Sequence, residues 1–241
     1  RVAQAVSTTV VISEFRVRGP NGAADEFVEL YNLSASPVNI GGWLIRGSNN
    51  AGTVSTRATI TAGTTINPGC FYLVTNSSTT GGPYSGSVAG NQSYTVGITD
   101  DGGIALTMSD GTTIVDQVGM STGSAYKEGT NLASLGTSNT DRGYEREPGG
   151  TSGHGNDTDN NSADFTLITP SNPQNSSSTC ITSGPDDPVI NEFSASTAGT
   201  DVEYLEFYGT PSTDYSAYTL LGIEGDSGSG EGVIDNVVPL G

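Results

Sequence analysis

The sequence predicts an all-β protein: a β-sandwich followed by a partial second β unit. Glycine accounts for 34 of the 241 residues and Lys plus Arg for only eight, a composition that favours strands joined by turns over long helices. Short apolar or alternating runs recur between Gly, Pro and Asn, and no segment has a sustained helical period. A third observation is an internal repeat. The block Val-Ile-Ser-Glu-Phe at residues 11–15 returns as Val-Ile-Asn-Glu-Phe at residues 189–193.

The individual strands follow from apolar and β-branched runs. Residues 26–31 alternate acidic and apolar side chains, a pattern typical of a strand with one face in solvent. Asp110 and Gly111 stand between two apolar runs and predict the turn of a β-hairpin. The predicted strands of the first unit are residues 9–17, 26–31, 42–45, 58–60, 71–74, 104–108, 112–118 and 165–168.

The repeat defines the domain organisation. A second acidic and apolar block, residues 26–31, returns at residues 203–208, and the two blocks are offset by 178 and 177 residues. Two strand-like blocks at nearly one separation indicate a tandem duplication, whose second copy is incomplete. We therefore expect a signal-peptide remnant or flexible N-terminus at 1–7, a sandwich at 8–175, a Ser/Pro linker at 176–187 and an incomplete second β domain at 188–241.

Several motifs resemble those of a known family. They are Ile-Ser-Glu at residues 12–14, the block at residues 25–32, Gly-Gly-Trp-Leu at residues 41–44, Asn-Pro-Gly-Cys at residues 67–70 and the closing stretch at residues 164–175. In this order they resemble the lamin tail domain, an immunoglobulin-like β-sandwich. The second copy looks more like the tandem units that precede catalytic domains in large extracellular nucleases. The resemblance implies a secreted or surface module of the bacterial type.

Charge and leader features bear on compartment and partners. The net charge of −18 repels phosphate backbones, so we expect no direct binding of nucleic acid. No apolar run is long enough to cross a bilayer. Ala3-Gln4-Ala5 fits the pattern that precedes signal-peptidase cleavage, although an ordinary flexible N-terminus fits as well. With the Ser-, Thr- and Asn-rich composition, this favours a secreted, extracellular or cell-surface protein.

The two cysteines, Cys70 and Cys180, permit one disulfide in a secreted chain. Such a bridge would pin the linker to the first domain. The alternative is two unpaired thiols.

Catalytic constellations are weak in this sequence. The only histidine, His154, lies among glycines, and we expect a solvent-exposed loop residue rather than a general base. The pairs Glu14/Glu29 and Glu192/Glu206 imitate a carboxylate dyad, but their recurrence in both copies favours a structural role, through loop backbone or Arg46. Four tyrosines in polar surroundings are either ordinary surface residues or a sugar-stacking platform: Tyr84, Tyr94, Tyr126 and Tyr144.

One acidic loop has oxygen side chains at the spacings of a calcium loop, although it lacks the Gly and Glu of an EF-hand. It is either a Ca²⁺ site or a solvated turn whose side chains cap backbone donors. The candidate ligands are Asp157, Asp159, Asn161 and Asp164.

The sequence therefore predicts a non-catalytic extracellular module that serves a structural, adhesive or targeting role in a larger secreted bacterial protein. Its expected partners are a protein or a surface polysaccharide, and self-association through β-edge pairing at residues 189–193 is a further expectation. The competing hypothesis is the N-terminal accessory region of an extracellular nuclease or phosphatase whose catalytic domain lies beyond residue 241.

Overall fold

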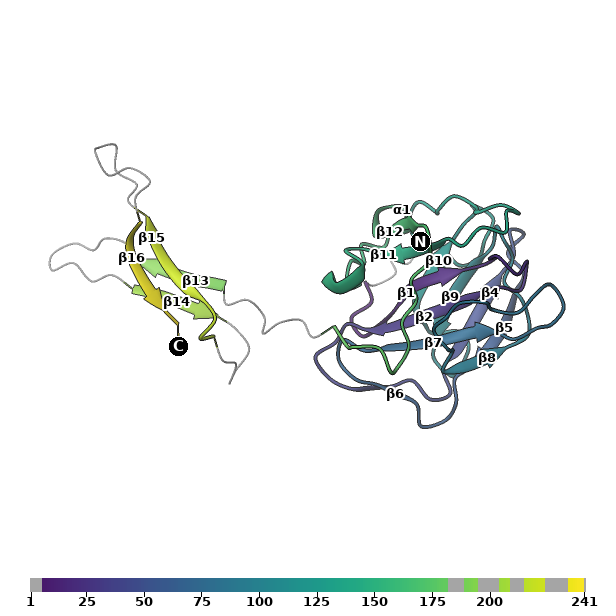
Figure 1. The fold of residues 1–241 in the computed structure, drawn as a ribbon, viewed down its shortest axis with the longest axis horizontal. Coiled ribbons are helices and arrows are strands. Elements are labelled where there is room, and N and C mark those ends of the chain that lie inside the picture. The colour runs from purple at the N-terminus through teal and green to yellow at the C-terminus, as the bar shows by residue number, and fades with distance from the viewer. Residues whose placement is uncertain (1–5, 182–188, 195–203, 209–214, 224–233, 241) are drawn as a thin grey trace. The chain divides into compact units, whose positions relative to one another are not determined.

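The computed structural model of the chain describes residues 6–181, 189–194, 204–208, 215–223 and 234–240. It divides into two compact units, Arg1–Ile181 and Thr182–Gly241 (Figure 1). The described residues are almost entirely strand and turn, as the composition predicted.

The first unit is a sandwich of two main sheets. The larger has the strand order β12-β11-β1-β2-β7-β8 and the smaller the order β10-β9-β4-β5, and a third sheet pairs β3 with β6. The strands are β1 (Val10–Arg16), β2 (Phe27–Asn32), β3 (Val38–Asn39), β4 (Leu44–Ser48), β5 (Val54–Thr59), β6 (Thr65–Ile66), β7 (Phe71–Asn76), β8 (Gln92–Tyr94), β9 (Gly103–Thr107), β10 (Ile114–Gly119), β11 (Gly143–Arg146) and β12 (Phe165–Ile168). Two short helical turns, η1 (Gly150–Ser152) and α1 (Asn161–Asp164), precede β12.

The core lies between the two main sheets. Ile12 and Phe15 of β1 pack with Ile104 and Leu106 of β9, and none of the four has any exposed surface. Burial of such side chains contributes about 1.5–3 kcal/mol each. Trp43 is only partly buried and packs against this cluster.

The predicted hairpin is confirmed. Strands β9 and β10 pair antiparallel around a turn in which Gly111 has a φ of 71°, a conformation that glycine adopts without strain. The Asp110 carboxylate accepts hydrogen bonds from the backbone N–H groups of Thr112 and Thr113, both at 2.8 Å. The side chain of Asp110 thus fixes the turn that its sequence position predicted.

The expectation that β2 has one face in solvent is wrong. All six of its residues are buried, because Tyr84 packs on Phe27, His154 packs on Tyr31, and the chain that follows β12 bonds to Glu29. The backbone N–H groups of Asn172 and Gln174 donate to the carboxylates of Glu14 and Glu29. Glu29 faces away from the core residues Val28 and Leu30 but is covered, whereas Glu26 lies on the other face and accepts a hydrogen bond from Tyr94 of the core.

A β-bulge interrupts the pairing of β1 with β2. Ile12 pairs with Leu30 and Glu14 pairs with Glu29, so Ser13 is one extra residue on β1. Its hydroxyl donates to Glu29 Oε1 at 2.5 Å. A bulge leaves backbone groups out of the ladder, and these must find other partners when they are buried.

The second unit contains two separate hairpins. Strand β13 (Val189–Ser194) pairs with β14 (Tyr204–Tyr208), and β15 (Thr219–Ile223) pairs with β16 (Ile234–Pro239). The first hairpin has the same irregularity as β1 and β2. Ile190 pairs with Phe207 and Glu192 with Glu206, which leaves Asn191 as the extra residue. The Asn191 amide donates to Glu206 Oε1 at 2.5 Å.

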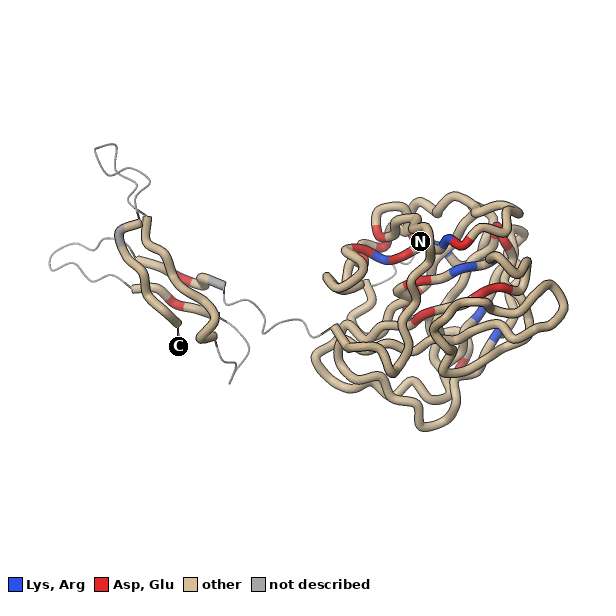
Figure 2. Tube along the Cα trace, in the orientation of Figure 1, with Lys and Arg blue, Asp and Glu red and all other residues tan. Residues whose placement is uncertain are grey.

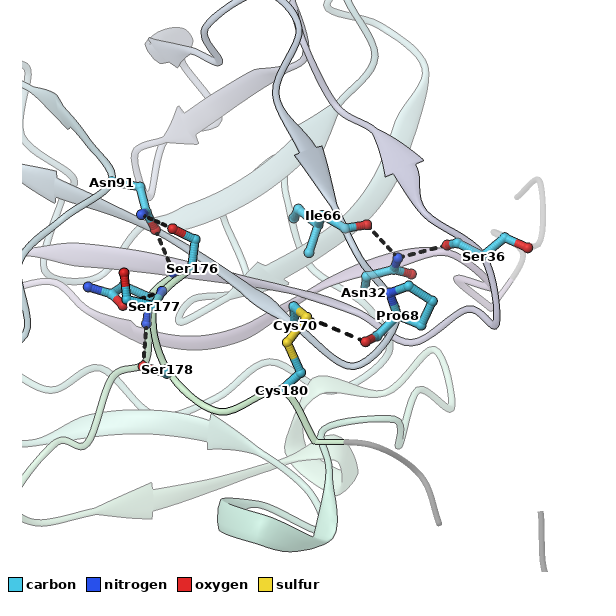
Figure 3. Close-up of a disulfide and its surroundings, with 11 residues drawn as sticks. Asn32, Ser36, Ile66, Pro68, Cys70, Asn91, Ser176, Ser177, Ser178 and Cys180 are labelled. Atoms are coloured by element: carbon cyan, nitrogen blue, oxygen red, sulfur yellow. Dashed lines mark hydrogen bonds between the residues drawn. A yellow bond between two sulfur atoms is a disulfide. The ribbon is translucent and has the colours of Figure 1, made fainter. Parts of the chain in front are cut away.

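Cys70 and Cys180 form a disulfide that closes a loop of 110 residues (Figure 3). Around the disulfide, residues 174–181 are hydrogen-bonded to the sandwich and do not form a free linker. The Asn91 amide donates to the hydroxyl of Ser176 at 2.5 Å, and the Ile181 N–H donates to the Gly69 carbonyl at 2.7 Å. Residues 182–188 of the predicted linker lie outside the described residues.

Removing this disulfide is expected to destabilise the first unit. In the loop-entropy model a closure of this length contributes about 3–5 kcal/mol. We expect the Cys70→Ser/Cys180→Ser variant to show a loss of that order in the free energy of unfolding, measured by urea denaturation. A double variant as stable as the oxidised wild type would contradict the expectation.

Candidate functional site

Arg146 is the centre of a buried polar cluster in the first unit. It ends strand β11, and its side chain is fully buried. Its Nη2 donates to both carboxylate oxygens of Asp116, at 2.9 and 2.7 Å, and its Nη1 donates to the carbonyl of Asn156 at 3.0 Å. The guanidinium also lies over the Phe165 ring, 4.5 Å from its centroid. Arg146 is in β11 of the larger sheet and Asp116 is in β10 of the smaller one, so the ion pair joins the two sheets.

The same pair satisfies the bulge in β1. Arg146 Nε donates to the Ile12 carbonyl at 2.9 Å, and Asp116 Oδ2 accepts from the Ile12 N–H at 2.5 Å. Both backbone groups of Ile12 therefore have charged partners from other strands. Hydrogen bonds to charged groups are among the strongest in proteins, and their loss inside a core is costly.

The four residues of the acidic loop lie near this cluster but do not point their oxygens at one centre. Asp164 accepts from the Thr158 N–H and hydroxyl, and Asn161 Oδ1 accepts from the N–H groups of Gly119 and Glu128. Asp157 Oδ2 accepts from the Ser7 N–H at 2.6 Å. Asp159 has a φ of 57° and a side-chain Oδ1 without a hydrogen-bond partner. Asp157, Asn161 and Asp164 are thus engaged by donors of the protein itself, as in a capped turn.

A different acidic trio is the closest approach to a metal site among the described residues. Asp116, Glu128 and Asp157 are all buried, with oxygens within 4.8 Å of one another. Burial, together with the charges of Asp116 and Asp157, raises the pKa of Glu128 to about 9. Glu128 therefore holds a proton at neutral pH. Of the predicted ligands, only Asp157 belongs to this trio, and calcium binding by the predicted loop stays a prediction that melting curves with and without millimolar Ca²⁺ would test.

The expectation that His154 is a solvent-exposed loop residue is wrong. It is fully buried between Tyr31 and Phe71, with ring centroids 5.3 and 5.6 Å away. Its Nδ1 lies 3.2 Å from the Arg146 carbonyl, and its Nε2 has no hydrogen-bond partner. Burial lowers the pKa of the imidazole, which keeps the ring neutral. The side chain serves as a packing element on the outer face of β2 and β7.

Glu14 and Glu29 are neighbours across the bulge, and both accept hydrogen bonds from backbone N–H groups of the segment after β12. Burial raises the pKa of Glu14 to about 8, and it raises that of Glu29 well above its usual range. Arg46 is not their partner, because it lies in β4 of the other sheet and donates to Thr56. The structure therefore supports a structural role for this pair, in which both carboxyl groups bind loop backbone.

The tyrosines do not form a platform for a sugar. Tyr94, Tyr126 and Tyr144 are each less than 8% exposed, and Tyr84 packs its ring edge against Phe27. A separate open cavity of about 410 Å³ has a mixed lining that includes Ala24, Asn76, Ile98 and Thr99. At this cavity Glu26 accepts hydrogen bonds from Asn76, Tyr94 and the Ile98 N–H, so its oxygens are occupied by the protein.

Comparison with protein families matches the first unit. Residues 3–122 match the lamin tail domain family. The lamin tail match spans strands β1 to β10 and ends before β11 and β12, whereas the resemblance seen in the sequence extends to residue 175. The match and the strand arrangement agree on an immunoglobulin-like β-sandwich, a non-catalytic type of module. No curated protein matches the chain. No helix in the described ranges is long and apolar enough to cross a membrane.

Two residues that sequence reasoning missed organise the first unit. They are Arg16 and Arg146, the two largest fully buried side chains. Arg16 forms an ion pair with the buried Asp25 and another with Asp141 at 2.6 Å. The signal that could have identified them was their rarity. In a chain with only eight Lys and Arg residues, an arginine within a predicted strand indicates a buried acidic partner.

Replacing Arg146 tests its role at the bulge. We expect Arg146→Met to lower the free energy of unfolding by about 3–5 kcal/mol, because it leaves the Asp116 carboxylate buried without a counter-charge. The matched control is Arg18→Met, whose pair with Asp100 is partly exposed and worth about 0–1 kcal/mol. Equal losses in the two variants, measured by chemical denaturation, would show that Arg146 is an ordinary ion-pair residue.

The buried acids predict that stability falls as pH rises. The folded Glu128, with its pKa near 9, keeps a proton that the unfolded chain releases near pH 4.5. Between these values the folded state binds more protons, so each pH unit costs up to about 1.4 kcal/mol for such a group. We expect the free energy of unfolding to be higher at pH 5 than at pH 8, and less pH-dependent in Glu128→Gln. An unchanged pH profile in the variant would show that Glu128 is ionised in the folded protein.

Proposed function

We propose that this chain is a non-catalytic module of a larger secreted bacterial protein, with a structural, adhesive or targeting role outside the cell. The observation that carries the proposal is the state of the only histidine. His154 is neutral, fully buried between two aromatic rings and out of reach of a substrate. The lamin tail match over residues 3–122 supports the same conclusion.

The buried acidic groups of the first unit further support a structural role. The oxygens of Asp116, Asp164, Glu14 and Glu29 accept hydrogen bonds from the protein itself. A catalytic acid or base must instead be within hydrogen-bond reach of a substrate. The hydrogen bonds of these carboxylates hold loops and sheets in place.

The compartment and the partner belong to this proposal. The disulfide between Cys70 and Cys180 supports an oxidising location, since disulfides persist mainly outside the cytosol. Loops at the two ends of the sandwich are where we place contacts with a protein or a surface polysaccharide. Such loops vary without disturbing the two sheets.

The second candidate is the accessory region of an extracellular nuclease or phosphatase. The repeated bulge of β1 and β13 favours it, because it supports a second domain copy of the kind that the sequence resemblance placed before catalytic domains. In that arrangement the present residues would position an enzyme without taking part in its chemistry. Sequencing the gene beyond the codon for residue 241 separates the two candidates.

The proposal predicts that the purified chain has no turnover of its own. Incubation with DNA, RNA or a phosphate monoester in the presence of Mg²⁺ or Ca²⁺ should leave each substrate intact. Commercial nuclease and phosphatase in the same buffers provide the positive control. Hydrolysis that copurifies with the chain and disappears in Arg146→Met would overturn the non-catalytic assignment.

A further inference from the structure

One end of the sandwich carries the open cavity of about 410 Å³. Three segments line it: residues 23–26 before β2, residues 76–80 at the end of β7 and residues 95–99 after β8. Strand β2 is antiparallel to β7, and β7 is parallel to β8, so the three segments lie at the same end of the larger sheet. A cavity of this volume is typical of a site for a small molecule.

The carboxyl group of Glu26 ties the three segments together. Its Oε1 accepts from the Ile98 N–H at 2.9 Å, and its Oε2 accepts from the Asn76 amide at 2.9 Å. The Ala24 N–H donates to the Gly81 carbonyl at 2.9 Å, which joins the first two segments a second time. The walls of the cavity are therefore held in place by the protein itself, and such preorganisation lowers the free-energy cost of binding a ligand.

The lining combines hydroxyl groups with small apolar surfaces. Four of its residues carry a hydroxyl group: Ser78, Thr80, Thr95 and Thr99. A hydroxyl group can donate one hydrogen bond and accept two. Within the described part of the chain, the hydroxyls of Thr80, Thr95 and Thr99 make no hydrogen bond to the protein, so they are available to a ligand. Ala24 and Ile98 add apolar contact surface between these groups.

The charge around the cavity favours an uncharged ligand. Residues 76–99 contain no Lys, Arg, Asp, Glu or His, although charged residues make up 14% of the chain, and in Figure 2 this stretch, which contains β8, is tan throughout. Glu26 is the only ionisable residue of the described lining, and its side chain has no exposed surface. Burial raises the pKa of this carboxyl to about 7. An anion would find no basic partner here, and a cation would find no exposed carboxylate.

We propose that this cavity binds one pyranose ring of a neutral polysaccharide. The free threonine hydroxyls form hydrogen bonds with the hydroxyl groups of the ring, and Ala24 and Ile98 contact its C–H face. Because the cavity is open, the polysaccharide chain can continue from the bound ring into solvent. This inference rests on the proposed adhesive or targeting role, and it selects a polysaccharide rather than a protein as the partner.

Titration of the full ¹⁵N-labelled chain with simple hexosides tests the proposal. The probes are methyl α-glucopyranoside, methyl α-mannopyranoside and methyl β-galactopyranoside. We expect at least one of them to bind at millimolar concentration and to shift the amide signals of residues 76–80 and 95–99. Two charged compounds serve as comparison ligands: methyl glucuronide, an anion, and Nα-acetyl-lysine amide, a cation. Both should bind at least about tenfold more weakly, because each brings an unpaired charge into the cavity.

Isosteric variants test the role of the hydroxyl groups. Thr95→Val and Thr99→Val each remove one hydroxyl with little change in side-chain shape. Each should weaken hexoside binding by about threefold to tenfold, the effect of one lost hydrogen bond. The matched control is Thr65→Val in β6, an exposed position outside the cavity, which should leave the affinity unchanged. Circular dichroism and the amide spectra check that all three variants fold.

An absence of shifts with all three hexosides, or equal affinity in the cavity variants and the control variant, would overturn the proposal. Tighter binding of the lysine derivative than of the hexosides would also overturn it, and would identify a protein side chain as the occupant. Release of methanol from a bound hexoside would support the site but contradict the non-catalytic function. A chain that neither binds nor hydrolyses the hexosides would lose the proposed site alone, so the two failures are distinguishable.

Discussion

The fold of the first unit depends on how the bulge in β1 is satisfied. Ser13 is one extra residue on β1, and the ion pair of Arg146 with Asp116 supplies hydrogen-bond partners for both backbone groups of the adjoining Ile12. Because the two charged residues belong to different sheets, the local irregularity and the sandwich stabilise each other. Without Arg146 the Asp116 carboxylate would be buried with no counter-charge, whereas Arg146 also lies 3.7 Å from Asp157 and 4.0 Å from Asp164.

Several acidic side chains of the first unit are buried and serve as acceptors for backbone donors. Glu14, Glu29, Asp116 and Asp164 are all fully or almost fully buried, and each accepts at least one backbone N–H. The chain has 26 acidic residues and only eight Lys and Arg, so few of these carboxylates can have a basic partner. Part of its formal charge is neutralised by protons held through burial, as at Glu128 and Glu14.

Sequence patterns predicted the strands well and the surroundings of individual side chains poorly. Periodicity and turn chemistry are local, so the hairpin at Asp110-Gly111 and strands such as β12 were predictable. The burial of His154 and of the outer face of β2 depends on segments more than 80 residues away in sequence, and composition carries no signal for such contacts. Asp157, Asn161 and Asp164 are spaced like calcium ligands, yet capping needs the same residue types, so spacing alone did not distinguish the two roles.

The position of the disulfide has a mechanical consequence. Cys180 is two residues before Thr182, where the second unit begins, and its partner Cys70 directly precedes β7, which lies inside the larger sheet between β2 and β8. A force applied to the chain at residue 182 reaches β7 through the disulfide. Strand β12 and the segment that covers Glu14 and Glu29 precede Cys180 in the chain, so the disulfide shields them from this force. Tension on a tethered protein would therefore bypass the strand that peels most readily, the terminal one at the sheet edge.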